Sequence, residues 1–208
     1  MTGSGAIEAV VFDVGRVLVH WDMRALFRKL IADPAELDWF CSTVVTEAWH
    51  FQHDAGRPLA EMVAERSAEY PGHAHLIEAY AARFNETIPG TIDGTVALVE
   101  ALHARGVPLY AITNFGDELW QRFRPTLPVL GRFRDIVVSG VEKIAKPDPA
   151  IYALAERRFG HPGRAMLFVD DNAANVVAVR EAGWQGHLFT DPAALERDLV
   201  AHGLLGFA

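Results

Sequence analysis

The sequence predicts an α/β protein, a doubly wound parallel sheet with a helical segment inserted after its first strand. Short apolar runs rich in β-branched residues alternate with helical patterns along the second half of the chain, and such alternation is typical of parallel sheets. The first such run, 9–12, is separated from the others by a stretch that holds helical patterns only. We therefore expect a core formed by residues 1–19 and 88–208, and a helical cap formed by residues 20–87.

Run 9–12 is expected to be a buried strand because it is continuously apolar and β-branched. Within the helical segment, Asp33-Pro34-Ala35-Glu36 is a helix start. The aspartate can cap the helix, the proline suits its first turn, and an acid follows three residues after the cap. Further helices are expected over 44–50, 59–70 and 76–87.

From residue 89 onward, helices and strands are expected in regular alternation. The expected helices are 93–105, 117–123, 148–159 and 172–182, and the expected strands are 109–113, 136–139, 166–169 and 187–190. Three of the helices run into a glycine (Gly106, Gly160 and Gly183). Glycine is the residue that most readily adopts the left-handed conformation that ends a helix. The alternation supports the parallel sheet.

Composition excludes several classes of function. Of the 208 residues, 50% are hydrophobic and 22% are charged, as in an ordinary globular protein. The formal net charge of -8 disfavours a nucleic acid partner. No apolar stretch is long enough to cross a bilayer, and residues 1–6 lack the features of a signal peptide. Cys41 is the single cysteine, which excludes a disulfide framework and fits a cytoplasmic location.

Polar residues follow three of the expected strands at the point where each one ends. Asp13 follows the first, Thr113 and Asn114 end the second, and Asp170 and Asp171 end a third. Ligands of open α/β sheets bind at the carboxyl ends of the strands. We therefore expect these side chains to share one ligand site.

A lysine is expected at the same site. Lys146 follows strand 136–139 on a short loop stiffened by Pro147 and Pro149, in a chain that holds three lysines among 19 basic residues. Three carboxylates that face one site repel one another unless a cation lies among them, and hard oxygen ligands suit Mg²⁺. Lys146 and Mg²⁺ together would neutralise a phosphoryl group, and Asp13 could attack its phosphorus to form an acyl phosphate.

Taken together, these motifs resemble those of the haloacid dehalogenase-like (HAD) hydrolases. The four motifs are Asp13-Val14-Gly15-Arg16-Val17-Leu18, Thr113, Lys146-Pro147-Asp148-Pro149 and Asp170-Asp171-Asn172. Their order and spacing agree with the family over nearly the whole chain, and the helical segment corresponds to the family's C1-type cap. Within the family, the chain is most similar to bacterial sugar-phosphate phosphatases of the glucose-1-phosphatase type. It shares with them Gly15 and the cap sequence 47–56.

The resemblance implies a role for each motif residue in metal binding. Asp13 would be the nucleophile and a Mg²⁺ ligand, and the backbone carbonyl of Gly15 would be a second ligand. Asp171 would bind the metal directly, and Asp170 directly or through water. The implied reaction is the Mg²⁺-dependent hydrolysis of a small phosphorylated metabolite.

The resemblance also implies which residues bind the substrate. Thr113 and Asn114 would hold the phosphoryl oxygens, and Lys146 would hold both the phosphate and Asp13. In the cap, His50 and His53 are candidates for substrate contact only.

Gly15 departs from the commoner family pattern, because most HAD phosphatases carry an aspartate there as general acid and base. Such a group contributes about two to four orders of magnitude in rate. Three explanations are open. In the first, the leaving group is acidic enough to depart unprotonated, as an anomeric hydroxyl would be. In the second, a nearby group supplies the proton, and the candidates are His20, His50, His53 and Asp54. In the third, the protein binds phosphorylated ligands and turns them over slowly. We expect the first, with the second as its closest alternative.

A 2-haloacid dehalogenase is the alternative enzyme, since it uses the same aspartate on carbon without a metal. Those enzymes usually carry an aromatic residue at the position of Gly15 and lack the second acid of the last motif. Both Gly15 and Asp171 therefore disfavour this reading.

Overall fold

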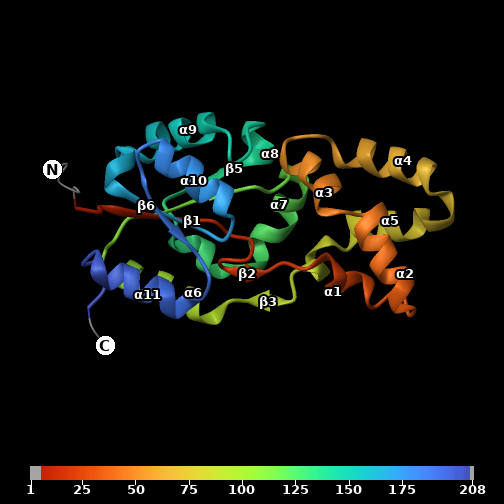
Figure 1. Cartoon of the computed structure of the whole chain (residues 1–208), viewed down its shortest axis with the longest axis horizontal. Helices are drawn as coiled ribbons and strands as arrows, with labels where there is room; N and C mark the ends of the chain where they lie inside the picture. The colour runs from red at the N-terminus through yellow and green to blue at the C-terminus, as the bar shows by residue number, and fades with distance from the viewer. Residues whose placement is uncertain (1–5, 207–208) are drawn as a thin grey trace.

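In the computed structural model, which describes residues 6–206, a five-stranded parallel sheet forms the centre of the molecule (Figure 1). The strand order is β5-β4-β1-β6-β7, and Val10 of the central strand pairs with Leu109 on one side and Leu167 on the other. The strands are β1 (Ala9–Phe12), β4 (Leu109–Thr113), β5 (Asp135–Val138), β6 (Met166–Asp170) and β7 (Gln185–Leu188). The predicted doubly wound parallel sheet is confirmed.

Helices cover both faces of the sheet, because alternate residues of each buried strand point to opposite sides. Val10 and Phe12 belong to one apolar cluster, and Ala9 and Val11 belong to the other. Figure 1 shows α9 and α10 on one side of the sheet, with α6 and α11 on the other. The helices of the core are α6 (Asp93–Ala104), α7 (Asp117–Phe123), α8 (Ser139–Glu142), α9 (Pro149–Phe159), α10 (Ala173–Glu181) and α11 (Pro192–Ala201).

The segment between two short antiparallel strands, β2 (Val19–His20) and β3 (Gly90–Thr91), is helical. Its helices are α1 (Met23–Phe27), α2 (Pro34–Trp39), α3 (Glu47–Asp54), α4 (Leu59–Glu69) and α5 (Ala74–Ala82). Figure 1 shows α2 to α5 grouped at the opposite end of the molecule from the chain termini. The expected helical character is found. The division of the chain into a core and a cap of residues 20–87 stays a prediction. The terminal residues of the expected core, 1–5 and 207–208, lie outside the described residues.

Side-chain caps explain where several helices begin. The carboxylate of Asp33 accepts a hydrogen bond from the backbone of Ala35 (2.9 Å), and Asp148 accepts one from Ala150 (2.8 Å). In α3, the hydroxyl of Thr46 accepts from the backbone N–H of Trp49 (3.0 Å). These bonds satisfy N–H groups that have no partner within the helix.

The structure corrects several expected boundaries. The helix expected over 44–50 begins only after the Thr46 cap, because residues 40–44 form a separate wide turn. The helix expected over 76–87 ends at Ala82, and a 3₁₀ turn, Phe84–Thr87, follows it. The last strand lies two residues earlier than expected, and α1, α8, α11, β2 and β3 were not foreseen.

The expected absence of a signal peptide concerns residues 1–6. Of these, only Ala6 belongs to the described residues. Within residues 6–206, none of the helices combines the length and the apolar character that a bilayer crossing requires.

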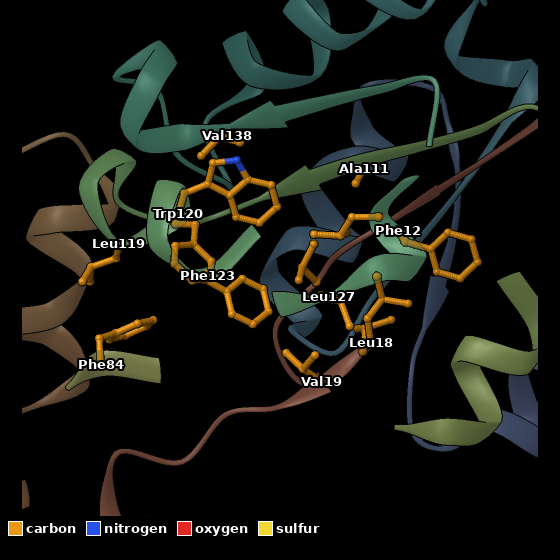
Figure 2. Close-up of a cluster of buried hydrophobic side chains, with 14 of the residues drawn as sticks. Phe12, Leu18, Val19, Phe84, Ala111, Leu119, Trp120, Phe123, Leu127 and Val138 are labelled. Carbon is orange, nitrogen blue, oxygen red and sulfur yellow. The ribbon is translucent and has the colours of Figure 1, made fainter. Parts of the chain in front are cut away.

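Aromatic packing joins the helical segment to the core. Phe84 contacts Phe115 edge to face, with ring centroids 5.4 Å apart. Figure 2 shows Phe84 beside Leu119 and Phe123 of α7. This contact closes one side of a cavity at the carboxyl ends of the strands.

Candidate active site

The candidate site lies where β1, β4 and β6 end, on either side of the central strand. A cavity of about 160 Å³ opens at this point. Its wall on the side of the sheet is formed by Asp13, Gly15, Asn114, Lys146, Asp171, Asn172 and Asn175. Strand order reverses around β1, and α/β sheets bind ligands at such a position.

Asp13 presents one oxygen to the cavity while the other is held. Its Oδ1 accepts hydrogen bonds from the backbone N–H of Val14 (2.7 Å) and lies 2.9 Å from Nζ of Lys146. Oδ2 accepts no hydrogen bond from the described residues. The side chain is therefore oriented as a nucleophile would be, with one oxygen anchored and one free.

Lys146 is almost fully buried between two carboxylates. Its Nζ lies 2.9 Å from Asp13 and 2.7 Å from Asp170, and the residue is 1% exposed. Burial lowers the pKa of Lys146, but the two carboxylates outweigh this effect and raise it above the usual range. The side chain is therefore an ammonium ion at neutral pH.

Asn114 fixes the backbone that carries this lysine. The Asn114 amide donates to the carbonyl of Lys146 (2.9 Å), and its oxygen accepts from the Lys146 N–H (2.9 Å). These reciprocal bonds tie the end of β4 to the loop that presents the ammonium group.

Three carboxylates form a cluster with the chemistry of a metal site. Oxygens of Asp13, Asp170 and Asp171 all lie within 4.8 Å of one another. Asp170 is held by the backbone N–H of Asn172 (2.8 Å) and by the amide of Asn175 (3.0 and 3.1 Å). Asn175 therefore supports the Asp170 carboxylate from α10.

Charges in this cluster do not balance without a cation. Burial raises the pKa of Asp13 to about 7, although Lys146 lowers it, and the charge of Asp170 raises it further. Burial and the charge of Asp170 also raise the pKa of Asp171. One ammonium group among three carboxylates leaves an excess of negative charge on hard oxygen donors. The residues therefore fit a divalent cation such as Mg²⁺.

Gly15 leaves an open space beside Asp13. A Cβ at this position would have no atom within 4 Å. The next residue, Arg16, has a left-handed backbone conformation (φ 56°). Its guanidinium pairs with Glu47 at the start of α3 and lies 4.8 Å from the ring centroid of Trp21.

The wall contributed from outside the sheet is largely aromatic. It includes Trp21, Phe84, Phe115, Ile88, His50 and Asp54. The His50 ring lies 5.0 Å from the Trp21 centroid and 5.6 Å from that of Phe84, and its Nδ1 is 2.6 Å from the hydroxyl of Tyr80. Burial lowers the pKa of His50 to about 3, so its imidazole is neutral.

Asp54, the last residue of α3, joins that helix to the core. Its Oδ1 accepts a hydrogen bond from the backbone N–H of Gly116 (2.9 Å), and its carbonyl accepts one from the hydroxyl of Ser139 (2.6 Å). Its Oδ2 lies 3.3 Å from Nε2 of His50. Burial raises the pKa of Asp54 to about 7, while His53 and the Gly116 hydrogen bond lower it.

Four predicted residues do not line the cavity. Asp170 is fully buried and contacts Lys146 from behind the cavity wall. Thr113 ends β4 and is 1% exposed. His53 is buried, with Nδ1 2.8 Å from the carbonyl of Arg57, and its ring packs so closely on Gly116 that a Cβ there would overlap it. His20 is exposed on β2.

The sequence did not reveal the parts played by Arg16 and Tyr80. Arg16 stands inside the first motif without a pattern that marks it as a link to α3. Tyr80 meets His50 from 30 residues away, and no local signal predicts such a contact.

Comparisons with known proteins agree with this geometry. The family model "haloacid dehalogenase-like hydrolase" matches residues 7–183. The validoxylamine A 7'-phosphate phosphatase of Streptomyces hygroscopicus is 28% identical over 134 residues, which is 62% of this chain and 62% of that protein. A sesquiterpene phosphatase of Aspergillus oryzae is 25% identical over 190 residues, covering 90% of this chain and 92% of that protein. An (S)-2-haloacid dehalogenase of Pseudomonas putida is 30% identical over 90 residues, covering 43% and 40%.

Among solved structures, a HAD family enzyme of Bacteroides thetaiotaomicron in complex with magnesium and inorganic phosphate has a similar fold. Its TM-score is 0.67 at 22% identity, and the match covers 89% of this chain and 95% of that one.

Proposed function

The chain belongs to the haloacid dehalogenase-like hydrolases, and we propose that it is a Mg²⁺-dependent phosphatase that acts on a small phosphorylated metabolite through an acyl phosphate on Asp13. The observation that carries the proposal is the buried cluster of Asp13, Asp170 and Asp171 around the Lys146 ammonium group. Such a cluster suits a divalent cation, which would compensate the excess negative charge of the carboxylates, and the cation and the Lys146 ammonium group together would bind a phosphoryl group. The relatives that are named as phosphatases support the same reaction class.

In the proposed reaction, Oδ2 of Asp13 attacks phosphorus, and the bond from phosphorus to the leaving oxygen breaks. Water then attacks the phosphorus of the acyl phosphate and restores the Asp13 carboxylate. Val14 and Lys146 anchor Oδ1 throughout, so the attacking oxygen keeps its direction. Mg²⁺ held by Asp13, Asp170, Asp171 and the Gly15 carbonyl would supply positive charge to the phosphoryl oxygens.

We assign Lys146 to the phosphoryl oxygens. Thr113 was expected to contact them, but it is buried at the end of β4 and does not line the cavity. Asn114 was expected to contact them as well, but its amide and carbonyl are occupied by the backbone of Lys146. Its main part in the proposal is therefore to position that lysine.

We further propose that residues 20–87 act as a C1-type cap that shapes the leaving-group side of the site. This segment contributes Trp21, His50, Asp54 and Phe84 to the cavity. The cavity of about 160 Å³ is smaller than the roughly 300–1,000 Å³ of pockets for drug-sized ligands, which supports a small substrate.

Sugar phosphates are the substrates that we propose to test first, because the sequence motifs resemble those of the glucose-1-phosphatase type, although the phosphatase relatives named above act on other phosphates. A sugar ring presents apolar C–H faces and polar hydroxyl edges. The cavity offers both kinds of partner, aromatic rings at Trp21 and Phe84 and polar groups at His50 and Asp54.

The dehalogenase alternative draws support from the 30% identical relative, whose match spans 90 residues. A dehalogenase uses its aspartate on carbon and needs no metal. The third carboxylate of the cluster, Asp171, has no part in that chemistry, and its place within 4.8 Å of Asp13 favours the phosphatase. A slow phosphate-ligand-binding protein is the other alternative, because Gly15 supplies no acid.

The test is phosphate release from a panel of sugar phosphates with Mg²⁺ or with EDTA. We expect release that requires Mg²⁺ and is lost in Asp13→Asn. Asp117→Asn, which changes an exposed aspartate in the first turn of α7, is the matched control and should keep full activity. Release that EDTA does not affect would refute the proposal. Halide release from 2-chloropropionate would favour the dehalogenase, and ligand binding without turnover would favour the binding protein.

A further inference from the structure

Alcohol phosphates need a proton on the leaving oxygen, and the position two residues after the nucleophile cannot supply it. Gly15 has no side chain, and the space beside its Cα is open. The donor must therefore come from another titratable group that lines the cavity. Within the described residues these groups are Asp13, Arg16, His50, Asp54, Lys146 and Asp171.

Most of these groups are excluded by their chemistry. Asp13 and Asp171 belong to the carboxylate cluster, and Lys146 is held between two of its members. Arg16 carries a guanidinium that does not release a proton in proteins. His50 is neutral, because burial disfavours its charged form. Asp54 is the group that remains.

We infer that Asp54 is the general acid and base of this site, placed on the cap side where Gly15 leaves the usual position empty. The inference rests on the proposed phosphatase function. In the first step the Asp54 carboxyl group donates its proton to the leaving oxygen as the bond from that oxygen to phosphorus breaks. In the second step the Asp54 carboxylate takes a proton from the attacking water, which restores the carboxyl group and completes the balance.

Fixed contacts hold the carboxyl group at the cavity wall. Oδ1 is anchored by the Gly116 N–H, and the backbone of the same residue is anchored by the Ser139 hydroxyl. Oδ2 is the oxygen left to carry the proton, and it faces Nε2 of His50 at 3.3 Å. His50 is held in turn by the hydroxyl of Tyr80. A donor that is already oriented loses little entropy when it acts.

The environment of Asp54 also suits proton transfer near neutral pH. Burial raises its pKa to about 7, and His53, the Gly116 hydrogen bond and Lys146 lower it. General acids work best when their pKa lies near the working pH. Burial lowers the pKa of His50, which faces Asp54, to about 3, and it raises the pKa of Tyr80, which contacts the other side of His50, well above its usual value.

The test compares leaving groups that differ in their need for a proton. 4-Nitrophenyl phosphate releases a stable phenolate, whereas a primary-alcohol phosphate releases a strongly basic alkoxide. In Asp54→Asn, we expect release of the primary alcohol to fall by about 10²–10⁴-fold in a single turnover, because the acid is gone. Nitrophenolate release in the first turnover should stay within a few-fold. It should appear as a burst, because the second step lacks its base.

A second variant separates loss of the acid from a general loss of structure, and the pH dependence of the unmodified protein, given below, tests the inference without Asp54→Asn. Gly15→Asp fills an open space and puts an acid at the position that is usual in the family. We expect Gly15→Asp to restore single-turnover alcohol release in the Asp54→Asn background. Ser139→Ala is the matched control, since it removes a hydrogen bond from the same junction without removing an acid. It should affect both substrates equally.

In the unmodified protein, the ratio of alcohol release to nitrophenolate release should fall as the pH rises above about 7. Both substrates share the nucleophile, so its ionisation cancels in the ratio.

Equal losses on both substrates in Asp54→Asn, or no loss on either, would overturn the inference. A ratio that does not change with pH would overturn it as well. Failure of the proposed function looks different, because the unmodified protein would then release neither product from any phosphate ester.

Discussion

Replacing Asp54 with asparagine should change the pH dependence of folding, independently of any catalytic effect. Asparagine retains an oxygen that can accept the hydrogen bond from Gly116, but it cannot ionise. Asp54 is buried at 6% exposure, and burial raises its pKa from 3.8 to about 7. The variant therefore removes the ionisation of residue 54 and keeps the hydrogen bond from the Gly116 N–H.

The sign of the effect follows from that raised pKa. The folded protein holds the Asp54 proton more tightly than the unfolded chain does. The stability that this proton contributes is fully present below pH 3.8 and is lost as the pH rises through about 7. The difference between the two values corresponds to about 4 kcal/mol, with a slope of about 1.4 kcal/mol per pH unit between them. Asp54→Asn has no ionisable group at this position, so its stability does not decrease for this reason as the pH rises.

The assay is urea unfolding of both proteins in EDTA, in steps from about pH 5 to about pH 8. The free energy of unfolding of Asp54→Asn, relative to that of the unmodified protein, should increase as the pH rises. This difference should become constant above about pH 7. Asp191→Asn is the control. The cap that Asp191 forms on α11 lowers its pKa, so it stays ionised over this window and should show a constant difference. A constant difference for Asp54→Asn would refute the reasoning.

Three further predictions concern the same site. Gly116→Ala should destabilise the protein by about 1–3 kcal/mol in urea unfolding, because the new methyl group overlaps the ring of His53. Mg²⁺ should raise the melting temperature of the unmodified protein, and Asp171→Asn should abolish most of that rise in a thermal scan, because it removes a proposed ligand. Asn175→Ala should weaken Mg²⁺ binding by about 10–100-fold in a titration of the same thermal shift, because both oxygens of Asp170 lose a donor.

Each of these predictions has a control or a contradicting result. Gly131→Ala, which has no atom within 4 Å of the added Cβ, should stay within about 0.5 kcal/mol of the unmodified protein. Asn172→Ala removes the cap on α10 at a cost of about 1 kcal/mol and should leave the Mg²⁺ titration unchanged. A Mg²⁺ shift that survives in Asp171→Asn would contradict the assigned ligand. An unchanged titration in Asn175→Ala would contradict the role of that amide.

The sheet could be predicted because its strands are buried on both faces and are therefore continuously apolar. The expected strand 109–113 coincides with β4, and the expected helix 117–123 coincides with α7. Parallel strands also bring their carboxyl ends together, so the meeting of Asp13, Lys146 and Asp170 followed from their places along the chain.

Features set by distant contacts could not be predicted in this way. Strands β2 and β3 have two residues each, which is too short for a periodic pattern. The bond from the Gly116 backbone to Asp54 joins residues 62 positions apart, and neither residue carries a local signal for it. The hydrogen bond from the Asn114 side chain to the backbone of Lys146 depends on the geometry of the loop, which the residue type does not reveal.

The two ends of α3 are attached to the core by bonds of very different strength. At its first turn, Glu47 meets Arg16 in an ion pair whose side chains are 59% and 42% exposed. Such a pair is worth only about 0–1 kcal/mol. At its last turn, Asp54 is fastened by buried bonds to Gly116 and Ser139. We therefore expect the Glu47 end of α3 to separate from the core at a lower free-energy cost than the Asp54 end.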